Sequence, residues 1–305
     1  MKKYKAIIIG AGPAGHSCAV RIAEMGGKVA VVERDYIGGI CTNWGCTPSK
    51  AMIESAKVAR EVENSHLYGI NVKDFNIDFP AIANRRNAVV QNTRASITDL
   101  LNHHNVDIYQ GEAFVSSPDR ILVRYGKLND ETYQMEFTGE EETLQTENII
   151  LATGSKALIP GFINQDDPTI VSSHRLITIN ELPESLTIVG GGVIGLEFAT
   201  IFSNLGTRVT IVELLPRVLA MMDEDISAEI TCIMGEKGVN ILTNHKVTEL
   251  QNGVLKAINQ DTGETVSIES GMNLIAIGRT AVLQEALYDR LGIKYTRKGI
   301  DVDDT

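Results

Sequence analysis

Two of the four cysteines, Cys41 and Cys46, lie five positions apart in the stretch GGICTNWGCTPSK. A zinc site does not explain them well, because such a site needs further cysteines or histidines nearby and the chain has no second pair. A structural disulfide closing so small a loop would contribute only about 2 kcal/mol. Cys18 and Cys232 lie in helical patterns and are expected in the core. The close pair therefore favours thiol–disulfide redox chemistry.

The spacing constrains the local backbone. Residues five apart on a regular helix are separated by about 7.5 Å along its axis, whereas a disulfide needs Cα atoms within about 7 Å. We therefore predict that Cys41 lies on a distorted turn leading into a helix. Gly45 provides a position without a Cβ atom, and Pro48 removes one N–H from the first turn. A helix start close to Lys50 also stabilises a thiolate, so the pattern predicts an exposed, positioned dithiol.

A dithiol of this kind needs elements that hold it, and residues 4–34 provide one complete unit. A short apolar strand meets the pattern GxGxxG, and a helix and a second strand follow. The first glycine allows a tight turn, the second lets backbone approach a pyrophosphate, and the third lets helix and strand pack closely. The helix start attracts phosphate and the acid after the second strand binds ribose hydroxyls. The predicted dinucleotide contacts are Gly10, Gly12, Pro13, Ala14, Gly15, Glu33 and Arg34.

Residues 185–213 repeat this design. In both copies the acid follows the first glycine by 23 positions. A glycine-rich turn without a ligand is a poor explanation when strand, glycines, helix, strand and acid occur in this order twice. We therefore predict a second dinucleotide, with contacts at Gly190, Gly192, Val193, Ile194, Gly195 and Glu213.

These patterns predict an α/β protein with two Rossmann-like dinucleotide-binding domains of the three-layer ββα type, each with a short antiparallel β-meander. The predicted domains are residues 1–155, residues 156–277, and a segment 278–305 that begins to return to the first domain. A helix is expected near 79–104. Strands follow it, with turns at Asn129–Asp130 and Gly139–Glu140, and buried strands are expected at 149–155 and 273–279.

The composition excludes several classes of function. Of the 305 residues 43% are hydrophobic, which is enough for two cores, and the net charge is −11. Such a charge disfavours nucleic acid or an anionic membrane as a partner. No apolar run is long enough to span a membrane. The N-terminus is typical of a first strand rather than a signal peptide, so a cytoplasmic protein is expected.

Together the motifs resemble the class I pyridine nucleotide-disulfide oxidoreductases, a flavoprotein family that includes dihydrolipoamide dehydrogenase, glutathione reductase and mercuric reductase. The resemblance covers essentially the whole chain. The sequence Pro48-Ser49-Lys50 favours the lipoamide or mercuric branches, and the resemblance as a whole is closest to dihydrolipoamide dehydrogenase. The segments that carry the resemblance are 10–15, 33–34, 38–50, 152–155, 190–197, 213 and 277–279.

The resemblance implies FAD on the first unit and NAD on the second, with electrons passing between NAD(H), FAD and a Cys41–Cys46 disulfide. It implies that Cys46 faces the flavin and Cys41 exchanges with substrate. It also places Lys50 near the flavin, paired with Glu197. The further FAD contacts that it implies are Gly39, Ile40, Cys41, Thr42, Cys46, Lys50, Gly111, Glu112, Ala113, Ala152, Thr153 and Gly154. For NAD they are Val247, Gly278 and Arg279.

The chain also departs from the family pattern. The family's catalytic histidine lies in a C-terminal interface domain that completes the partner subunit's site. This sequence stops before such a domain, so we expect a homodimer for a full-length form and impaired turnover for residues 1–305 alone. Ile40 replaces a common threonine. The chain's own histidines are expected on the surface rather than as a replacement base, namely His66, His103, His104, His174 and His245.

Several readings stay open at this point. A small disulfide or dithiol, or a lipoyl domain, is the expected substrate, but a mercuric or other disulfide reductase fits the same motifs. A catalytically incomplete fragment that binds nucleotides is a further alternative. A low-molecular-weight thioredoxin reductase fits poorly, because that family has a CxxC pair in its NAD domain.

Overall fold

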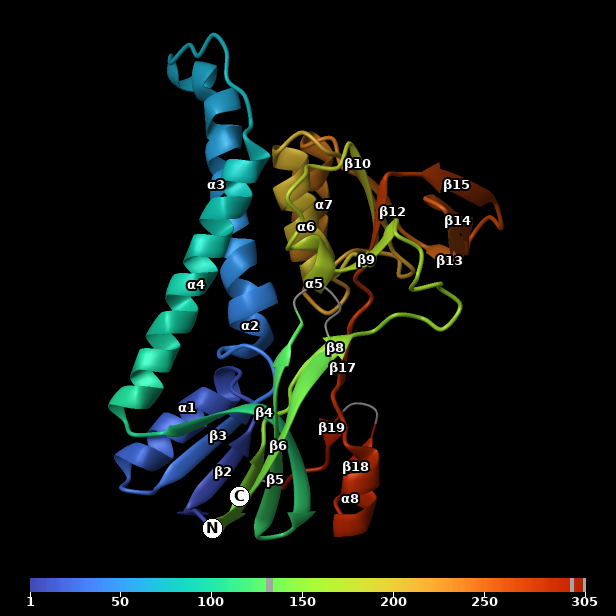
Figure 1. Cartoon of the computed structure of the whole chain (residues 1–305). Helices are drawn as coiled ribbons and strands as arrows, with labels where there is room; N and C mark the ends of the chain where they lie inside the picture. The colour runs from blue at the N-terminus through green and yellow to red at the C-terminus, as the bar shows by residue number, and fades with distance from the viewer. Residues whose placement is uncertain (130–133, 297–298, 304–305) are drawn as a thin grey trace. The chain divides into compact units, whose positions relative to one another are not determined.

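The computed structural model describes residues 1–129, 134–296 and 299–303 (Figure 1). The chain divides into two compact units. Unit 1 comprises Met1–Thr47, Val89–Lys156 and Thr280–Thr305, and unit 2 comprises Pro48–Ala88 and Ala157–Arg279. The predicted boundaries at 155 and 277 lie close to two of these divisions. Residues 48–88 belong to unit 2, and the predicted domain bounds stay a prediction.

Unit 1 contains a seven-stranded sheet in the order β1-β6-β5-β4-β3-β2-β7. The strands β4, β3, β2 and β7 are parallel, whereas β4, β5 and β6 form an antiparallel meander. The predicted turn at Gly139–Glu140 is wrong, because β6 continues through both residues and Gly139 accommodates a φ of +88°. The turn predicted at Asn129–Asp130 lies partly outside the described residues. The strands are β1 (Lys3–Tyr4), β2 (Ala6–Ile9), β3 (Val29–Glu33), β4 (Asp107–Ser117), β5 (Arg120–Leu128), β6 (Met135–Thr146) and β7 (Ile149–Leu151).

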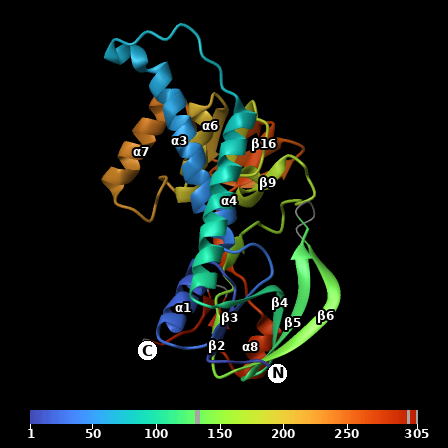
Figure 2. The same cartoon turned by 60° about the vertical axis from the view of Figure 1, so that its left-hand side comes forward.

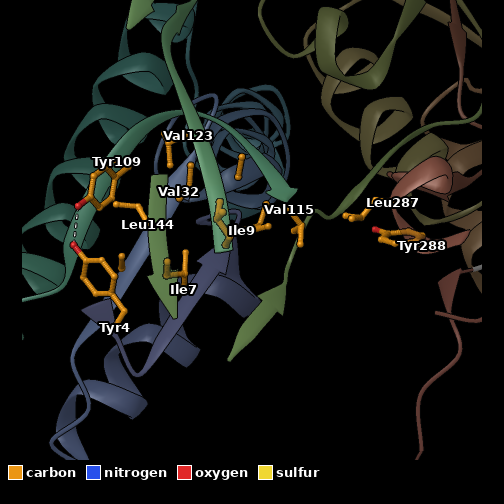
Figure 3. Close-up of a cluster of buried hydrophobic side chains, with 13 residues drawn as sticks. Tyr4, Ile7, Ile9, Val32, Tyr109, Val115, Val123, Leu144, Leu287 and Tyr288 are labelled. Atoms are coloured by element: carbon orange, nitrogen blue, oxygen red, sulfur yellow. Dashed lines mark hydrogen bonds between the residues drawn. The ribbon is translucent and has the colours of Figure 1, made fainter. Parts of the chain in front are cut away.

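Two buried clusters cover the two faces of this sheet. On one face Ile8 and Val31 pack with α1 (Pro13–Glu24) and with Leu101 near the end of α4 (Phe79–His103). On the other face Ile7, Ile9 and Val32 pack with the meander and with α8 (Glu285–Leu291), as Figure 3 shows. Unit 1 therefore has the predicted order of helix, parallel sheet and second β-layer.

Unit 2 repeats this topology. Its parallel sheet has the order β12-β11-β10-β16-β9, and a separate antiparallel meander contains β13, β14 and β15. The strands β12, β11, β10 and β16 correspond to β4, β3, β2 and β7 of unit 1, which confirms the predicted fold class. The strands are β9 (Ile170–Ser172), β10 (Ser185–Val189), β11 (Arg208–Val212), β12 (Asn240–Leu242), β13 (His245–Gln251), β14 (Val254–Asn259), β15 (Thr265–Glu269) and β16 (Met272–Ile275). The helices are α5 (Ser173–Leu176), α6 (Val193–Asn204) and α7 (Glu224–Glu236).

Long helices connect the first parallel strands to the meander of unit 1. The short helix α2 (Gly39–Trp44) is followed by α3 (Cys46–Glu63), the 3₁₀ helix η1 (Ser65–Tyr68) and α4. Figures 1 and 2 both show α3 beside α4, and within unit 2 Arg85 Nη1 donates to Ala51 O at 2.7 Å. No helix in the described part of the chain is long and apolar enough to cross a membrane. The remaining short strands are β8 (Ser155–Ala157), β17 (Arg279–Ala281), β18 (Tyr295–Thr296) and β19 (Gly299–Ile300).

A close backbone approach fixes the start of α2 in unit 1. The N–H of Gly38 donates to Ala11 O at 2.9 Å. Gly39 has a φ of +57°, and a Cβ atom on it would lie 2.7 Å from the Cα atom of Gly12. Real Cβ atoms essentially never come this close to backbone, so position 39 requires glycine for both its dihedral angle and its contact.

We predict that Gly39→Ala lowers the free energy of unfolding by about 2–4 kcal/mol, from the left-handed dihedral and the overpacking together. Gly26→Ala is the matched control, because Gly26 has a φ of +83° but open space around its Cβ position. It should cost only about 1 kcal/mol. Denaturant titration measures both, and equal losses would argue against the contact with Gly12.

The expectation that the histidines lie on the surface is wrong for two of them. His245 is only 8% exposed, and the ring Nε2 of His174, at the start of α5, is buried. Burial of His174 disfavours the charged imidazolium, and Arg279 adds a repulsive charge, so its pKa is lowered to about 4.

The lowered pKa of His174 predicts a pH dependence. Between pH 6.5 and 4 the unfolded chain binds a proton that the folded chain does not, so the free energy of unfolding falls as the pH falls through this range. The full shift corresponds to about 3 kcal/mol, and we expect about 1–2 kcal/mol because part of the ring stays solvated. His174→Gln should reduce this dependence, as measured by denaturant titration at several pH values. The exposed His66→Gln is the control, and a pH profile unchanged by His174→Gln would contradict the assignment.

Candidate active site and nucleotide-binding sites

The three glycines of the first GxGxxG turn have distinct roles in unit 1. A Cβ atom on Gly10 would lie 2.3 Å from Ala152 O, and one on Gly15 would lie 1.9 Å from Gly10 O. These glycines are required by packing. A Cβ on Gly12, by contrast, would have its nearest neighbour at 3.9 Å. Helix α1 begins directly after Gly12 and has no side-chain N-cap. The turn thus forms an open cradle of N–H groups that suits a pyrophosphate.

The acid at the end of β3 lies beside this turn. The buried Glu33 carboxylate accepts hydrogen bonds from the N–H groups of Ala11 at 2.6 Å and Asp35 at 2.9 Å. Burial raises the pKa of Glu33, and these backbone bonds oppose the shift. Burial and the Glu33 charge raise the pKa of Asp35 to about 7. Asp35 Oδ1 is buried with no hydrogen-bond partner among the described residues. A buried acid beside a half-buried one with a buried, unpaired oxygen fits a ligand that brings hydroxyl donors, as a ribose does.

The second turn, in unit 2, reproduces the first one. Glu213 Oε2 accepts from Gly191 N at 2.6 Å and its Oε1 from Leu215 N at 2.8 Å. A Cβ on Gly190 would lie 2.6 Å from Ala276 O, whereas Gly192 has nothing within 4 Å of that position. Helix α6 begins directly after Gly192, again without a side-chain N-cap. The second unit therefore offers the same cradle and the same oriented carboxylate.

Each cradle is bordered by the residues that follow a parallel strand. Ala152 N donates to Ile9 O at 2.9 Å, and Ala276 N donates to Val189 O at 2.8 Å. In unit 1 Thr153 Oγ1 donates to Val282 O at 2.9 Å and Gly154 accepts from Val282 N. The structure thus brings the sequence-predicted Ala152, Thr153 and Gly154 to the first turn. Gly278 follows Ala276 at the corresponding edge of unit 2.

The other sequence-predicted contacts are less closely gathered. Gly111, Glu112 and Ala113 lie in β4, where Glu112 Oε1 is 4.0 Å from Arg34 Nη1. A Cβ on Gly111 would lie 2.3 Å from Arg124 O, so sheet pairing alone explains this glycine. In unit 2 Val247 packs against a core cluster from β13. Arg279 begins β17. Their contacts with a cofactor stay predictions.

The cysteine pair lies where two helices meet. Cys41 is half-buried within α2, and the exposed Cys46 is the first residue of α3. Between them Gly45 leaves the helical conformation, with φ −127° and ψ −110°. The predicted distortion is therefore present, but at Gly45. Cys41 lies inside a short helix rather than on a turn. Ile40 is half-buried and Thr42 is buried beside it.

The predicted ion pair between α3 and α6 is present in unit 2. Lys50 Nζ donates to Glu197 Oε1. The side chains are 60% and 29% exposed, and solvated pairs contribute little to stability. The pair is therefore not a main source of stability for unit 2.

Sequence reasoning missed a polar network around α2. Asn43 and Arg94 are hydrogen-bonded at 3.0 Å, and the Arg94 guanidinium stacks on Tyr36. An asparagine between the two cysteines was the only signal in the sequence. Arg94 lies in a polar helical stretch, and nothing in that stretch indicated this contact.

The comparisons with known proteins agree with this geometry. The model of the pyridine nucleotide-disulphide oxidoreductase family matches residues 4–305. The dihydrolipoyl dehydrogenase of Acholeplasma laidlawii is 32% identical over 99% of this chain and 86% of its own length. That of Zymomonas mobilis is also 32% identical, over 98% of this chain and 63% of its own length.

A solved structure gives the same result. The HOCl-induced flavoprotein disulfide reductase RclA from Escherichia coli superposes with a TM-score of 0.80 at 28% identity, over 98% of this chain and 62% of that one. The chain thus spans less than two thirds of several of the proteins that it matches. Members of the matched family use FAD and a nicotinamide nucleotide. The chain belongs to the pyridine nucleotide-disulphide oxidoreductase family.

Proposed function

We propose that this chain passes electrons between NAD(H), FAD and a Cys41–Cys46 disulfide, most like a dihydrolipoyl dehydrogenase. The observation that carries the proposal lies in unit 1. There the segment with the cysteines begins against the phosphate cradle, through the Gly38–Ala11 hydrogen bond and the contact of Gly39 with Gly12. This contact therefore joins the cradle that would hold a dinucleotide to the segment that carries the dithiol.

Unit 1 would hold FAD. The turn at Gly12 and the start of α1 would hold the pyrophosphate, and Glu33 would accept from the adenosine ribose. The open Cβ space at Gly12 and the orphaned acid oxygen of Asp35 support this fit. When bound, the flavin supplies two-electron transfer between the nicotinamide nucleotide and the cysteines. Gly192 and Glu213 would hold NAD(H) in unit 2 in the same way.

The cysteines would do the thiol–disulfide chemistry. A substrate thiolate attacks the Cys41 sulfur, the Cys41–Cys46 bond breaks, and Cys46 leaves as a thiolate. The second substrate thiol gives up its proton to water and, as a thiolate, attacks the substrate sulfur bound to Cys41. Cys41 then leaves as a thiolate, the substrate becomes a disulfide, and both electrons remain on the cysteine pair. Lys50, held by Glu197, follows Cys46 by four positions in α3 and supplies a positive charge.

The substrate and the assembly also belong to this proposal. A lipoyl group or another small dithiol suits the exchange, and the expected assembly is a homodimer in the cytoplasm. A metal-ion or other disulfide reductase is the second candidate. It is favoured by one observation, since the superposed RclA has been solved as a Cu(II) complex. Reduction of Cu(II) or Hg(II) beside oxidation of dihydrolipoamide separates the two.

The two acids should control the two nucleotides separately. We expect Glu33→Gln to weaken FAD binding about 10–100-fold and leave NADH binding unchanged, because a charged hydrogen bond contributes about 1.5–3 kcal/mol. Glu213→Gln should weaken NADH binding by a similar factor and leave FAD binding unchanged. It should also relax the preference for NADH over NADPH, since a carboxylate about 4 Å from a 2′-phosphate repels it by at most about 4 kcal/mol.

Fluorescence titration of each variant with each nucleotide measures these effects, and each variant is the control for the other. If both variants lost the same nucleotide, the assignment of units would be wrong. If the wild type bound NADPH as tightly as NADH, the proposed role of Glu213 in nucleotide choice would fail.

The two cysteines should also differ. In the FAD-loaded chain we expect mild reduction to produce a long-wavelength absorption band, from a Cys46 thiolate against the oxidised flavin. The band should persist in Cys41→Ser and vanish in Cys46→Ser. Absorption spectroscopy under anaerobic conditions is the measurement. The opposite pattern would exchange the two roles, and the absence of a band in the wild type would exclude the pair from flavin contact.

A further inference from the structure

Helix α2 depends on the rest of unit 1 for its position. It has six residues, begins at a left-handed Gly38 without a side-chain cap, and ends at the non-helical Gly45. A helix this short is unstable alone in water. The location of Cys41, in the middle of α2, is therefore set by contacts from neighbouring segments.

Asn43 makes hydrogen bonds that contribute to this position. Its side chain is only 5% exposed. Its Nδ2 group donates to the carbonyl oxygens of Gly39 at 2.8 Å, Ile37 at 3.1 Å and Tyr36 at 3.3 Å. The bonds to Ile37 and Tyr36 join α2 to the loop before it. They form only while the amide nitrogen faces the carbonyl groups and the amide oxygen faces away.

Arg94 fixes that orientation from α4. Its Nε donates to Asn43 Oδ1 at 3.0 Å, so a reversed amide would set two donors against each other. Its guanidinium carbon lies 3.7 Å from the centroid of the Tyr36 ring. The centroid of this ring lies 6.0 Å from that of the Trp44 ring. A planar guanidinium provides both the stack and the hydrogen bond, which lysine does not. Arg94 thus holds the residues on both sides of Cys41.

We propose that Arg94 is a positioning residue that holds α2 so that the Cys41 thiol stays in reach of Cys46, and thereby favours the disulfide. The inference rests on the proposed redox function of the pair. Holding two reacting groups together raises their effective concentration. Loosening α2 lowers it, so the equilibrium moves from disulfide toward dithiol.

A purely electrostatic role for Arg94 would have the opposite effect. A nearby positive charge stabilises thiolates and so favours the reduced pair. Removal of the charge would then move the equilibrium toward the disulfide. The direction of the shift therefore separates positioning from charge.

The experiment equilibrates the FAD-loaded 305-residue chain anaerobically with glutathione buffers of known composition. Thiols are trapped by alkylation, and peptide mass spectrometry reports the state of Cys41 and Cys46 separately from Cys18 and Cys232. We expect Arg94→Ala to lower the ratio of disulfide to dithiol about tenfold, equivalent to about 30 mV. Arg94→Lys, which keeps the charge but loses the stack, should shift in the same direction. Arg94→Gln serves if Arg94→Ala does not fold.

Arg85→Ala is the matched control, because Arg85 also lies on α4 but donates to Ala51 O and Ser55 Oγ of α3. It should titrate like the wild type. Identical titrations of the wild type and Arg94→Ala would overturn the inference, and so would a shift of Arg94→Ala toward the disulfide. The inference would also fail if Arg94→Lys titrated like the wild type while Arg94→Ala was shifted. An equal shift in Arg85→Ala would do the same. If the wild-type pair formed no disulfide at any glutathione ratio, the proposed function itself would fail.

Discussion

The contact of two backbone segments at Gly12 and Gly39 determines how unit 1 is arranged. Glycine occupies both positions, but the contact itself requires it only at position 39. At Gly12 the missing side chain leaves the cradle open, and at Gly39 it allows the approach and the positive φ. Because the first segment starts α1 and the second starts α2, one contact sets the distance between the phosphate cradle and the cysteines. Cys41 and Asn43, which accepts a hydrogen bond from Arg94, lie in the helix that begins at this contact.

The duplicated unit separates the features that both cradles share from those found only beside the cysteines. Both copies share the first-glycine contact, the open middle glycine and the carboxylate with two backbone donors. They differ after the acid. In unit 1 the next segment donates from Gly38 to Ala11 O and continues into the cysteine helix. In unit 2 the corresponding donor is Leu219, to Gly191 O, and the chain continues into α7. The scaffold is therefore common, and the proposed redox chemistry belongs to the segment that follows one of its acids.

Interactions between residues that are close in the sequence could be predicted from it, and those between distant residues could not. The cradles and acids are local, because strand, turn, helix and acid follow one another within about thirty residues. Arg94 and Asn43 are 51 positions apart, and no periodicity records such a contact. Gly139 suggested a turn because glycine favours a positive φ, but here the φ is accommodated inside β6. Burial of His174 depends on packing around α5, which composition does not reveal. The pairing of Lys50 with Glu197, 147 positions away, was predictable only from the resemblance to a family.

The two acidic sites also differ in how strongly they need a ligand. In unit 1 the position two residues after the acid is Asp35, and its buried oxygen has no hydrogen-bond partner among the described residues. Two close carboxyl groups with raised pKa values are costly to ionise together. In unit 2 the same position is Leu215, which is 47% exposed and adds no charge. Ribose hydroxyls that donate to the first site would offset a cost that the second site does not have. Unit 1 should therefore gain more local stability from its nucleotide than unit 2, which suits a cofactor that stays bound in one unit and a nucleotide that exchanges in the other.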